Sequence, residues 1–284
     1  MDLAEEFMER RTPLQRVQGI LHKYPYLSPL IVLLVCVVVF YLLNDRFLLP
    51  QNLSFVTQQT VVVGTLAIAQ TLIILTAGID LSIGAMMTLA QMTMANLAVY
   101  ATASNVLPFA GQNPFIAIAL GILTGVACGA LNGLLIVRLN LPPFIVTLGT
   151  WQVFNATKYL YSKNETIRGQ DIEAQAPLLQ LFGIQIKFGG AVITLGVIFM
   201  VLLVVFLWYI LNYTAWGRRL YAVGDDPEAA QLTGIRVDRM LIAVYTLSGL
   251  ICGFAGWVLI GRIGSVVWAD QRLKILKGKI LIME

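Results

Sequence analysis

The feature that most constrains this chain is a block of 47 residues, 55–101, that carries a single charged side chain, Asp80. At 1.5 Å of rise per residue, one helix of this length would reach roughly 70 Å, whereas the hydrocarbon core of a bilayer is about 30 Å thick. The block therefore has to fold back on itself. Gly78-Ile79-Asp80 is the natural break, and it divides the block into two apolar segments, 55–77 and 81–101.

The composition places the whole chain in a membrane. Only 12% of the 284 residues are charged, 58% are hydrophobic and the mean hydropathy is +0.80, whereas soluble domains have about 25% charged residues. We therefore predict an all-α fold, a polytopic transmembrane helix bundle with about seven spans and one short cytoplasmic helix. The expected spans are 27–43, 55–77, 81–101, 115–137, 142–161, 188–211 and 241–261.

The distribution of Lys and Arg predicts the orientation. The N-terminal arm, 1–26, is basic and should be cytoplasmic, since positive residues stay inside. Counting crossings then places Arg138, the break at Asp80 and the loop 212–240 on the cytoplasmic side, and the loop 162–187 outside. The net charge of +4 is explained in this way, without nucleic acid as a partner. The count fails only at the basic tail, 262–284, which parity would place outside.

The sequence lacks the motifs of a catalytic site. It contains no GxxxxGK[ST] phosphate loop, no GxSxG elbow and no HExxH pair. Its three cysteines show no metal-binding spacing, and His22 is the lone histidine. We therefore expect no enzyme activity, no metal and no cofactor on this chain.

Glycines mark one face of the fourth expected span. They recur every four residues, which places them in a row where another helix can approach closely. Gly249 and Gly253 repeat this spacing in the seventh span. The residues assigned to helix packing are Gly121, Gly125, Gly129 and Gly133.

The loop 212–240 contains the pattern E-A-A-x-x-x-G. Asp225 or Asp226 can cap a short helix, Pro227 suits its first position, and Gly234 can end it in a left-handed conformation. A polar helix of about two turns next to the membrane suits docking into a groove on a soluble partner. The candidate docking residues are Asp225, Asp226, Glu228, Ala229, Ala230 and Gly234.

Three motifs in order carry a resemblance to a known family. E-A-A-x-x-x-G resembles the coupling helix of ABC importer permeases, and the surrounding GRRLYAVG and EAAQLTGI are similar to ribose/xylose/galactose-type sugar permeases. AGIDLSIG, around Asp80, resembles the same family, as do LNGLLI and LPPFIVTLGT at 131–150. Branched-chain amino-acid permeases share the general plan, but the whole set of motifs fits the sugar group better.

The resemblance implies a transport role and a set of partners. The chain would be the pore-forming permease subunit of a monosaccharide importer in the bacterial inner membrane, with its N-terminus in the cytoplasm. ATP would be bound by a separate ABC ATPase subunit that docks on the coupling helix. An extracytoplasmic sugar-binding protein would deliver the sugar, and a second permease subunit, identical or different, would complete the pore within the lipid bilayer.

Beyond Ser265 the chain departs from the family pattern, because no Gly-rich stretch follows. A truncated product or a genuinely shorter permease would explain this, and the first leaves a non-transporting remnant as an alternative function. A permease for another small polar solute, such as a branched-chain amino acid, is a second alternative. A secondary transporter would need paired intramembrane charges, and the 55–101 block has only Asp80.

Residues of the sugar path are expected among polar and aromatic side chains within the spans. In the fifth span Trp151 and Asn155 share a face with Thr147, and Gln152 lies beside them. For Asp80 two interpretations stand: a helix cap, stabilised by free N–H groups, or a gating residue beside the path. The two are compatible, because broken helices at membrane depth border transport paths.

Overall fold

The computed structural model describes residues 18–19, 21–24, 27–99, 113–162 and 166–266. Most of the expected N-terminal arm and most of the tail lie outside these residues. The chain forms two compact units, 1–53 and 54–284. In the first, α3 (Leu27–Leu43) is an uncharged apolar helix of 17 residues. It is followed by a turn in which Asn44 Oδ1 accepts a hydrogen bond from the Arg46 amide at 3.0 Å.

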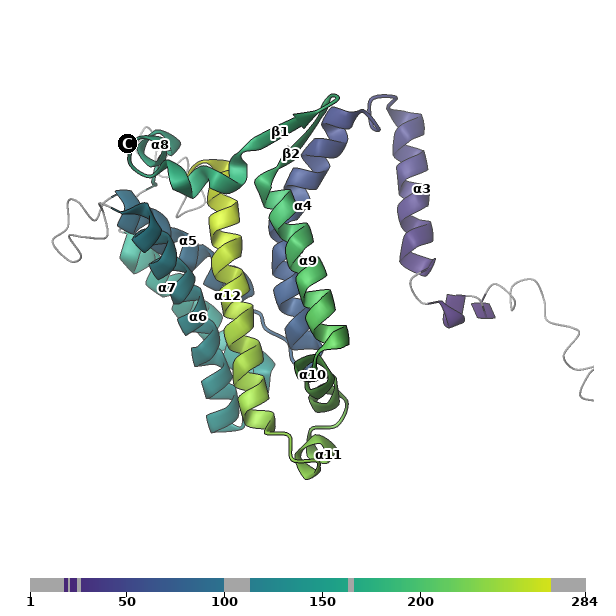
Figure 1. The fold of residues 1–284 in the computed structure, drawn as a ribbon, viewed down its shortest axis with the longest axis vertical. Coiled ribbons are helices and arrows are strands. Elements are labelled where there is room, and N and C mark those ends of the chain that lie inside the picture. Colours follow the sequence, from purple (N-terminus) through teal and green to yellow (C-terminus); the bar gives the residue numbers. More distant parts are fainter. Residues whose placement is uncertain (1–17, 20, 25–26, 100–112, 163–165, 267–284) are drawn as a thin grey trace, which may run out of the picture. The chain divides into compact units, whose positions relative to one another are not determined.

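The second unit is a bundle of long helices (Figure 1). Its members are α4 (Pro50–Ile74, which begins in the first unit), α5 (Ile83–Val99), α6 (Pro114–Leu139), α7 (Pro143–Ser162), α9 (Leu195–Tyr213) and α12 (Val237–Ile263). Among the described residues α4, α6, α9 and α12 are long and apolar enough to cross a membrane, while α3 and α5 are shorter apolar helices. The expected all-α polytopic membrane class is confirmed.

The centre of the bundle is the contact between α6 and α12, where glycines of both helices meet. A Cβ atom on Gly125 would lie 2.5 Å from the carbonyl oxygen of Gly249, and one on Gly129 would overlap the carbonyl oxygen of Tyr245. On the same row, a Cβ on Gly121 would lie 2.9 Å from the Ala90 carbonyl oxygen of α5. The backbones of α6 and α12 approach this closely because glycine has no side chain.

Short elements cover the two ends of α12 (Figure 1). At its C-terminal end lie α8 (Gly169–Gln175), η1 (Pro177–Gly183) and the antiparallel hairpin of β1 (Gln185–Phe188) and β2 (Ala191–Thr194). A backbone bridge from Ile167 to Val266 ties this segment down. At the N-terminal end of α12 lie α10 (Ala215–Asp225) and α11 (Pro227–Leu232). We call these the α8 end and the α11 end.

Several expected boundaries, and the number of helices in one loop, differ in the structure. The helix expected at 188–211 begins only at Leu195, because Gly189 and Gly190 have φ of +49° and +92° and turn the chain into the hairpin. The helix expected at 55–77 instead runs from Pro50 to Ile74. The loop 212–240 holds two helices rather than one, because Thr214 caps the first and Asp226 the second.

Candidate functional site

The segment between α4 and α5, residues 75–82, folds back into the bundle, and we call it the re-entrant segment. It starts at the α11 end, where a Cβ on Gly224 of α10 would overlap the Leu75 carbonyl oxygen. It then reaches Asn132 of α6, which lies seven residues, or about 10 Å of helix rise, before the last residue of α6. Asp80 therefore lies within the bundle.

The structure adds a depth within the bundle to the expected break, which the sequence placed between two spans on the cytoplasmic side. The chain runs from the α11 end toward the α8 end before α5 begins. Met87, near the start of α5, therefore lies beside Gly256 of α12: a Cβ atom added to Gly256 would be 2.9 Å from the Met87 carbonyl oxygen. Gly256 is 19 residues, about 28 Å, from the start of α12. The reversal is possible because Ala77 adopts φ +56° and Gly78 has no side chain to clash with Tyr245.

Hydrogen bonds hold the Asp80 carboxylate, which is 5% exposed. Its Oδ1 accepts from the Ser82 amide at 2.6 Å and from the Ser82 hydroxyl at 2.7 Å. Its Oδ2 accepts from Asn132 Nδ2 at 3.4 Å, and the same Nδ2 donates to the Ser82 hydroxyl at 2.7 Å. Within the described chain the carboxylate is thus balanced by hydrogen-bond donors and not by a cationic side chain. These contacts fix Ser82, the residue directly before α5.

Two further helices contribute to this buried polar cluster. The Thr147 hydroxyl of α7 accepts from the Leu81 amide at 3.2 Å and donates to the Ile79 carbonyl at 3.4 Å. Tyr245 of α12 is fully buried, and its hydroxyl lies next to Gly78. Within the described residues, neither that hydroxyl nor Asn132 Oδ1 has a hydrogen-bond partner. The cluster therefore joins the re-entrant segment to α6, α7 and α12 and retains unused polar atoms, which is typical of sites that take up water or change partners.

The other expected path residues lie apart from Asp80, further along α7. Trp151 is 39% exposed and Gln152 is also exposed, while Asn155 is half-buried. Asn155 Nδ2 donates to the Trp151 carbonyl at 3.0 Å, and its Oδ1 accepts from Lys158 at 3.4 Å. The structure brings Thr147 of this face to Asp80, but not Trp151, Gln152 or Asn155.

Sequence reasoning missed Asn132 and Tyr245 as members of the cluster. Asn132 had a usable signal, because it is a polar amide directly beside Gly133 in a glycine-lined helix face. Tyr245 had none, since a tyrosine in an apolar helix usually places its hydroxyl at the membrane interface.

At the α11 end the coupling residues form a well-defined helix. Asp226 is the N-cap of α11, and its Oδ1 accepts from the amides of Glu228 and Ala229 at 2.9 and 3.0 Å. Asp225 is the last residue of α10. Gly234, with φ +86°, ends α11 in a Schellman motif, in which its amide bonds to Gln231 and the next amide bonds to the Ala230 carbonyl.

One face of α11 is free among the described residues, while the other is held. Ala230 is 4% exposed and packs inward, whereas Glu228 and Ala229 are exposed and Leu232 is 91% exposed. The preceding helix, α10, is held in the bundle by the buried side chain of Leu220. The arrangement presents a short helix, rigid at both ends, with a polar and an apolar side chain directed outward.

Comparison with known proteins identifies the family. A family model described as branched-chain amino acid transport system / permease component matches residues 52–277. The fructose import permease protein FrcC of Rhizobium meliloti is 51% identical over 93% of this chain and 71% of its own length. The chain belongs to the sugar ABC import permeases.

Other sugar ABC import permeases agree with this assignment. The ribose import permease protein RbsC of Bacillus subtilis is 36% identical over 87% of this chain and 71% of its own length. The galactose/methyl galactoside import permease protein MglC of Escherichia coli is 32% identical over 83% of this chain and 70% of its own length. No solved structure matches the chain.

Proposed function

We propose that this chain is the pore-forming permease subunit of an ATP-driven importer for a monosaccharide. The observation that carries the proposal is the 51% identity with a fructose import permease over 93% of the chain. Ribose and galactose import permeases among the relatives support the same substrate class. Fructose is the first sugar to test.

The energy for import would come from a separate ATPase subunit, because the sequence has no phosphate-binding loop. We propose that α11 docks in a groove on that ATPase and that Glu228, Ala229 and Leu232 make the contact. The α11 end is then cytoplasmic, in keeping with the arginines of the loop 212–240, and the N-terminus is cytoplasmic in the bacterial inner membrane. A sugar-binding protein would approach the α8 end, and a second permease subunit would complete the pore.

Asp80 would link the helices that contact the ATPase, α10 and α11, to the path of the sugar. The re-entrant segment touches α10 through Leu75 and Gly224 and carries Asp80 into the polar cluster. A shift of α10 and α11 on ATP binding would thus be passed to the start of α5. We propose that the unused hydroxyl of Tyr245 and the amide oxygen of Asn132 take part in this rearrangement, with Trp151, Gln152 and Asn155 further along the sugar path.

Reconstitution tests the proposal. The chain, the ATPase and the binding protein encoded beside it are placed in proteoliposomes, and ATP hydrolysis and uptake are measured with fructose, ribose, galactose and leucine. We expect stimulation by a monosaccharide and none by leucine. Stimulation by leucine alone would favour the amino-acid alternative, which the family model's description suggests. Activity with none of the four would contradict the transport role.

The coupling role of α11 has its own variant. Glu228→Arg reverses the charge of an exposed residue at the docking face, so we expect sugar-stimulated ATP hydrolysis to fall at least tenfold while the helix persists. The matched control is Asp45→Arg, which reverses the charge of an exposed acidic residue in the turn that follows α3. Equal activity of the two variants would contradict docking through α11.

A further inference from the structure

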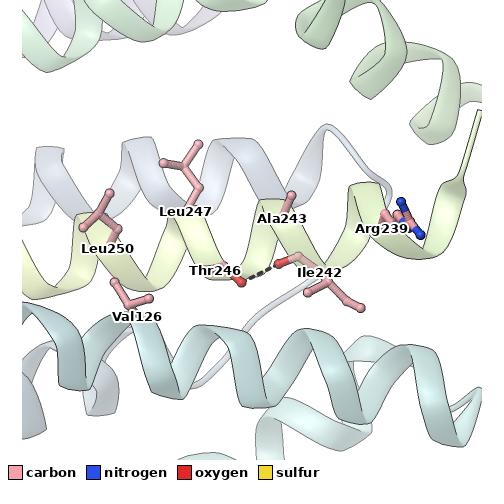
Figure 2. Close-up of a pocket in the computed structure, with 7 residues that line it drawn as sticks. All are labelled: Val126, Arg239, Ile242, Ala243, Thr246, Leu247 and Leu250. Carbon is pink, nitrogen blue, oxygen red and sulfur yellow. Dashed lines mark hydrogen bonds between the residues drawn. The ribbon is translucent and has the colours of Figure 1, made fainter.

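An apolar groove runs along α12 on the surface of the bundle (Figure 2). Val126 of α6 forms one wall, and Arg239 lies at one end. The Thr246 hydroxyl donates to the Ile242 carbonyl at 2.7 Å, so it is already satisfied. The side chains along α12 are Ile242, Ala243, Thr246, Leu247 and Leu250.

The groove continues into a polar pocket at the α11 end. Arg239 and Ala243 line both hollows, and Arg219 of α10 and Arg236 join them in the second. Three arginines thus line one hollow near the start of α12. In the described part of the chain no salt bridge neutralises them. Arg236 and Arg239 also line a neighbouring hollow together with Glu228 and Asp238, whereas neither of these acidic residues lines the pocket that contains Arg219.

The dimensions fit one leaflet of a membrane. From Arg239 to Leu250 the groove follows 11 residues, about 16 Å of helix rise, which is half of the ~30 Å hydrocarbon core. Trp216, half-buried, lines the pocket beside the arginines, and tryptophan is enriched at the depth of the lipid headgroups. The charged pocket and the apolar groove are therefore at the levels of a headgroup and of an acyl chain.

We propose that this surface binds one anionic phospholipid, with its phosphate held by Arg219, Arg236 and Arg239 and one acyl chain in the groove along α12. The occupant follows from charge complementarity, since basic pockets beside membrane helices select anionic headgroups. A soluble anion would use the arginines but leave the apolar groove empty. A phospholipid satisfies both parts.

The bound lipid would also hold α11 in place. Thr233, Gly234 and Ile235, which lead out of α11, line the same pocket as the arginines of α10 and α12. A phosphate between these arginines would therefore join α10 to the start of α12 and restrict the chain that connects α11 to α12. Slower amide exchange in α11 is expected when the anionic lipid is bound.

Lipid titration of the full chain in detergent, followed by native mass spectrometry, tests the site. Phosphatidylglycerol and phosphatidylcholine with identical acyl chains are compared. We expect one phosphatidylglycerol to bind at least tenfold more tightly, and Arg219→Gln, Arg236→Gln and Arg239→Gln each to weaken it about fivefold. The matched control, Arg218→Gln, changes an exposed arginine of α10 outside the pocket and should stay within twofold.

The acyl-chain part is tested separately. Ala243→Phe fills the groove and should weaken phosphatidylglycerol as much as loss of an arginine, while Val201→Phe, at an exposed position of α9, should not. A variant is used only if its melting temperature in lipid-free detergent equals that of the native chain, so that weaker lipid binding does not reflect loss of folding. Equal binding of the two lipids, an equal effect of Arg218→Gln, or binding of inorganic phosphate at the affinity of phosphatidylglycerol would overturn the proposal.

Discussion

At the scale of single residues, Asp80 shows what a sequence can and cannot disclose. Its importance was predictable, because it is the single charge in 47 residues and lies two residues after Gly78. Its bond to Asn132 was not, because Asn132 belongs to a helix made much later in the chain. Hydrogen bonds between distant helices depend on how those helices pack, and no local pattern encodes them.

Replacing Asp80 should separate its structural from its transport role. Asp80→Ala leaves the buried Ser82 amide and the Ser82 hydroxyl without their acceptor, so we expect the free energy of unfolding to fall by about 1–3 kcal/mol. Asp80→Asn keeps an acceptor oxygen for the Ser82 amide and should cost less. Thermal denaturation in detergent measures both.

The control for this comparison is Asp45→Ala, which removes an exposed carboxylate and should leave the melting temperature unchanged. If Asp80→Asn keeps stability but loses uptake, its charge serves transport. Equal melting temperatures for Asp80→Ala and the native chain would show that the carboxylate does not stabilise the start of α5.

At the scale of helices, the glycine rows were visible in the sequence, and the structure places those of α6 and α12 against each other. The division of the loop 212–240 was less visible. The pattern around Glu228 predicted one helix there, and the Asp226 cap was among the alternatives. The preceding helix α10 escaped notice because its buried residues, Leu220 and Val223, are sparse among arginines and small residues.

A pair of glycine substitutions tests the α6–α12 contact. Gly129→Ala would place a methyl group against the Tyr245 carbonyl oxygen. A backbone atom cannot move aside by a change of rotamer, so we expect the free energy of unfolding to fall by about 1–3 kcal/mol. Gly149→Ala, in α7, meets nothing within 4 Å and should be neutral or stabilise by up to about 1 kcal/mol. Melting curves recorded side by side decide this, and a tolerated Gly129→Ala would refute the close approach.

At the scale of the whole molecule, hydropathy locates helices but not their depth. The apolar block 55–101 indicated two segments and a break, yet nothing local showed that the break would climb into the bundle. That depth is set by the contacts of the 75–82 segment with α6, α7 and α12. Orientation came from charge counting, and it remains a prediction.

Cysteine labelling tests the orientation. The exposed positions Leu232 at the α11 end and Lys187 at the α8 end are replaced by cysteine, one at a time, after exposed Cys36 has been changed to serine. A membrane-impermeant maleimide should label Lys187→Cys in intact spheroplasts and Leu232→Cys only in inverted vesicles, because these positions lie at opposite ends of α12. Labelling of both from one side would contradict a single crossing by α12.

The pairing of Gly125 with Gly249 also determines when, during synthesis of the chain, the contact between α6 and α12 can form. The two glycines are separated by about 120 residues, which a ribosome delivers in roughly 6–25 s at 5–20 residues per second. Throughout that interval α6 is inserted, but the row of small residues that should receive α12 faces lipid or the insertion machinery. The nascent chain is therefore most exposed to quality-control proteases after α6 enters the membrane and before α12 does.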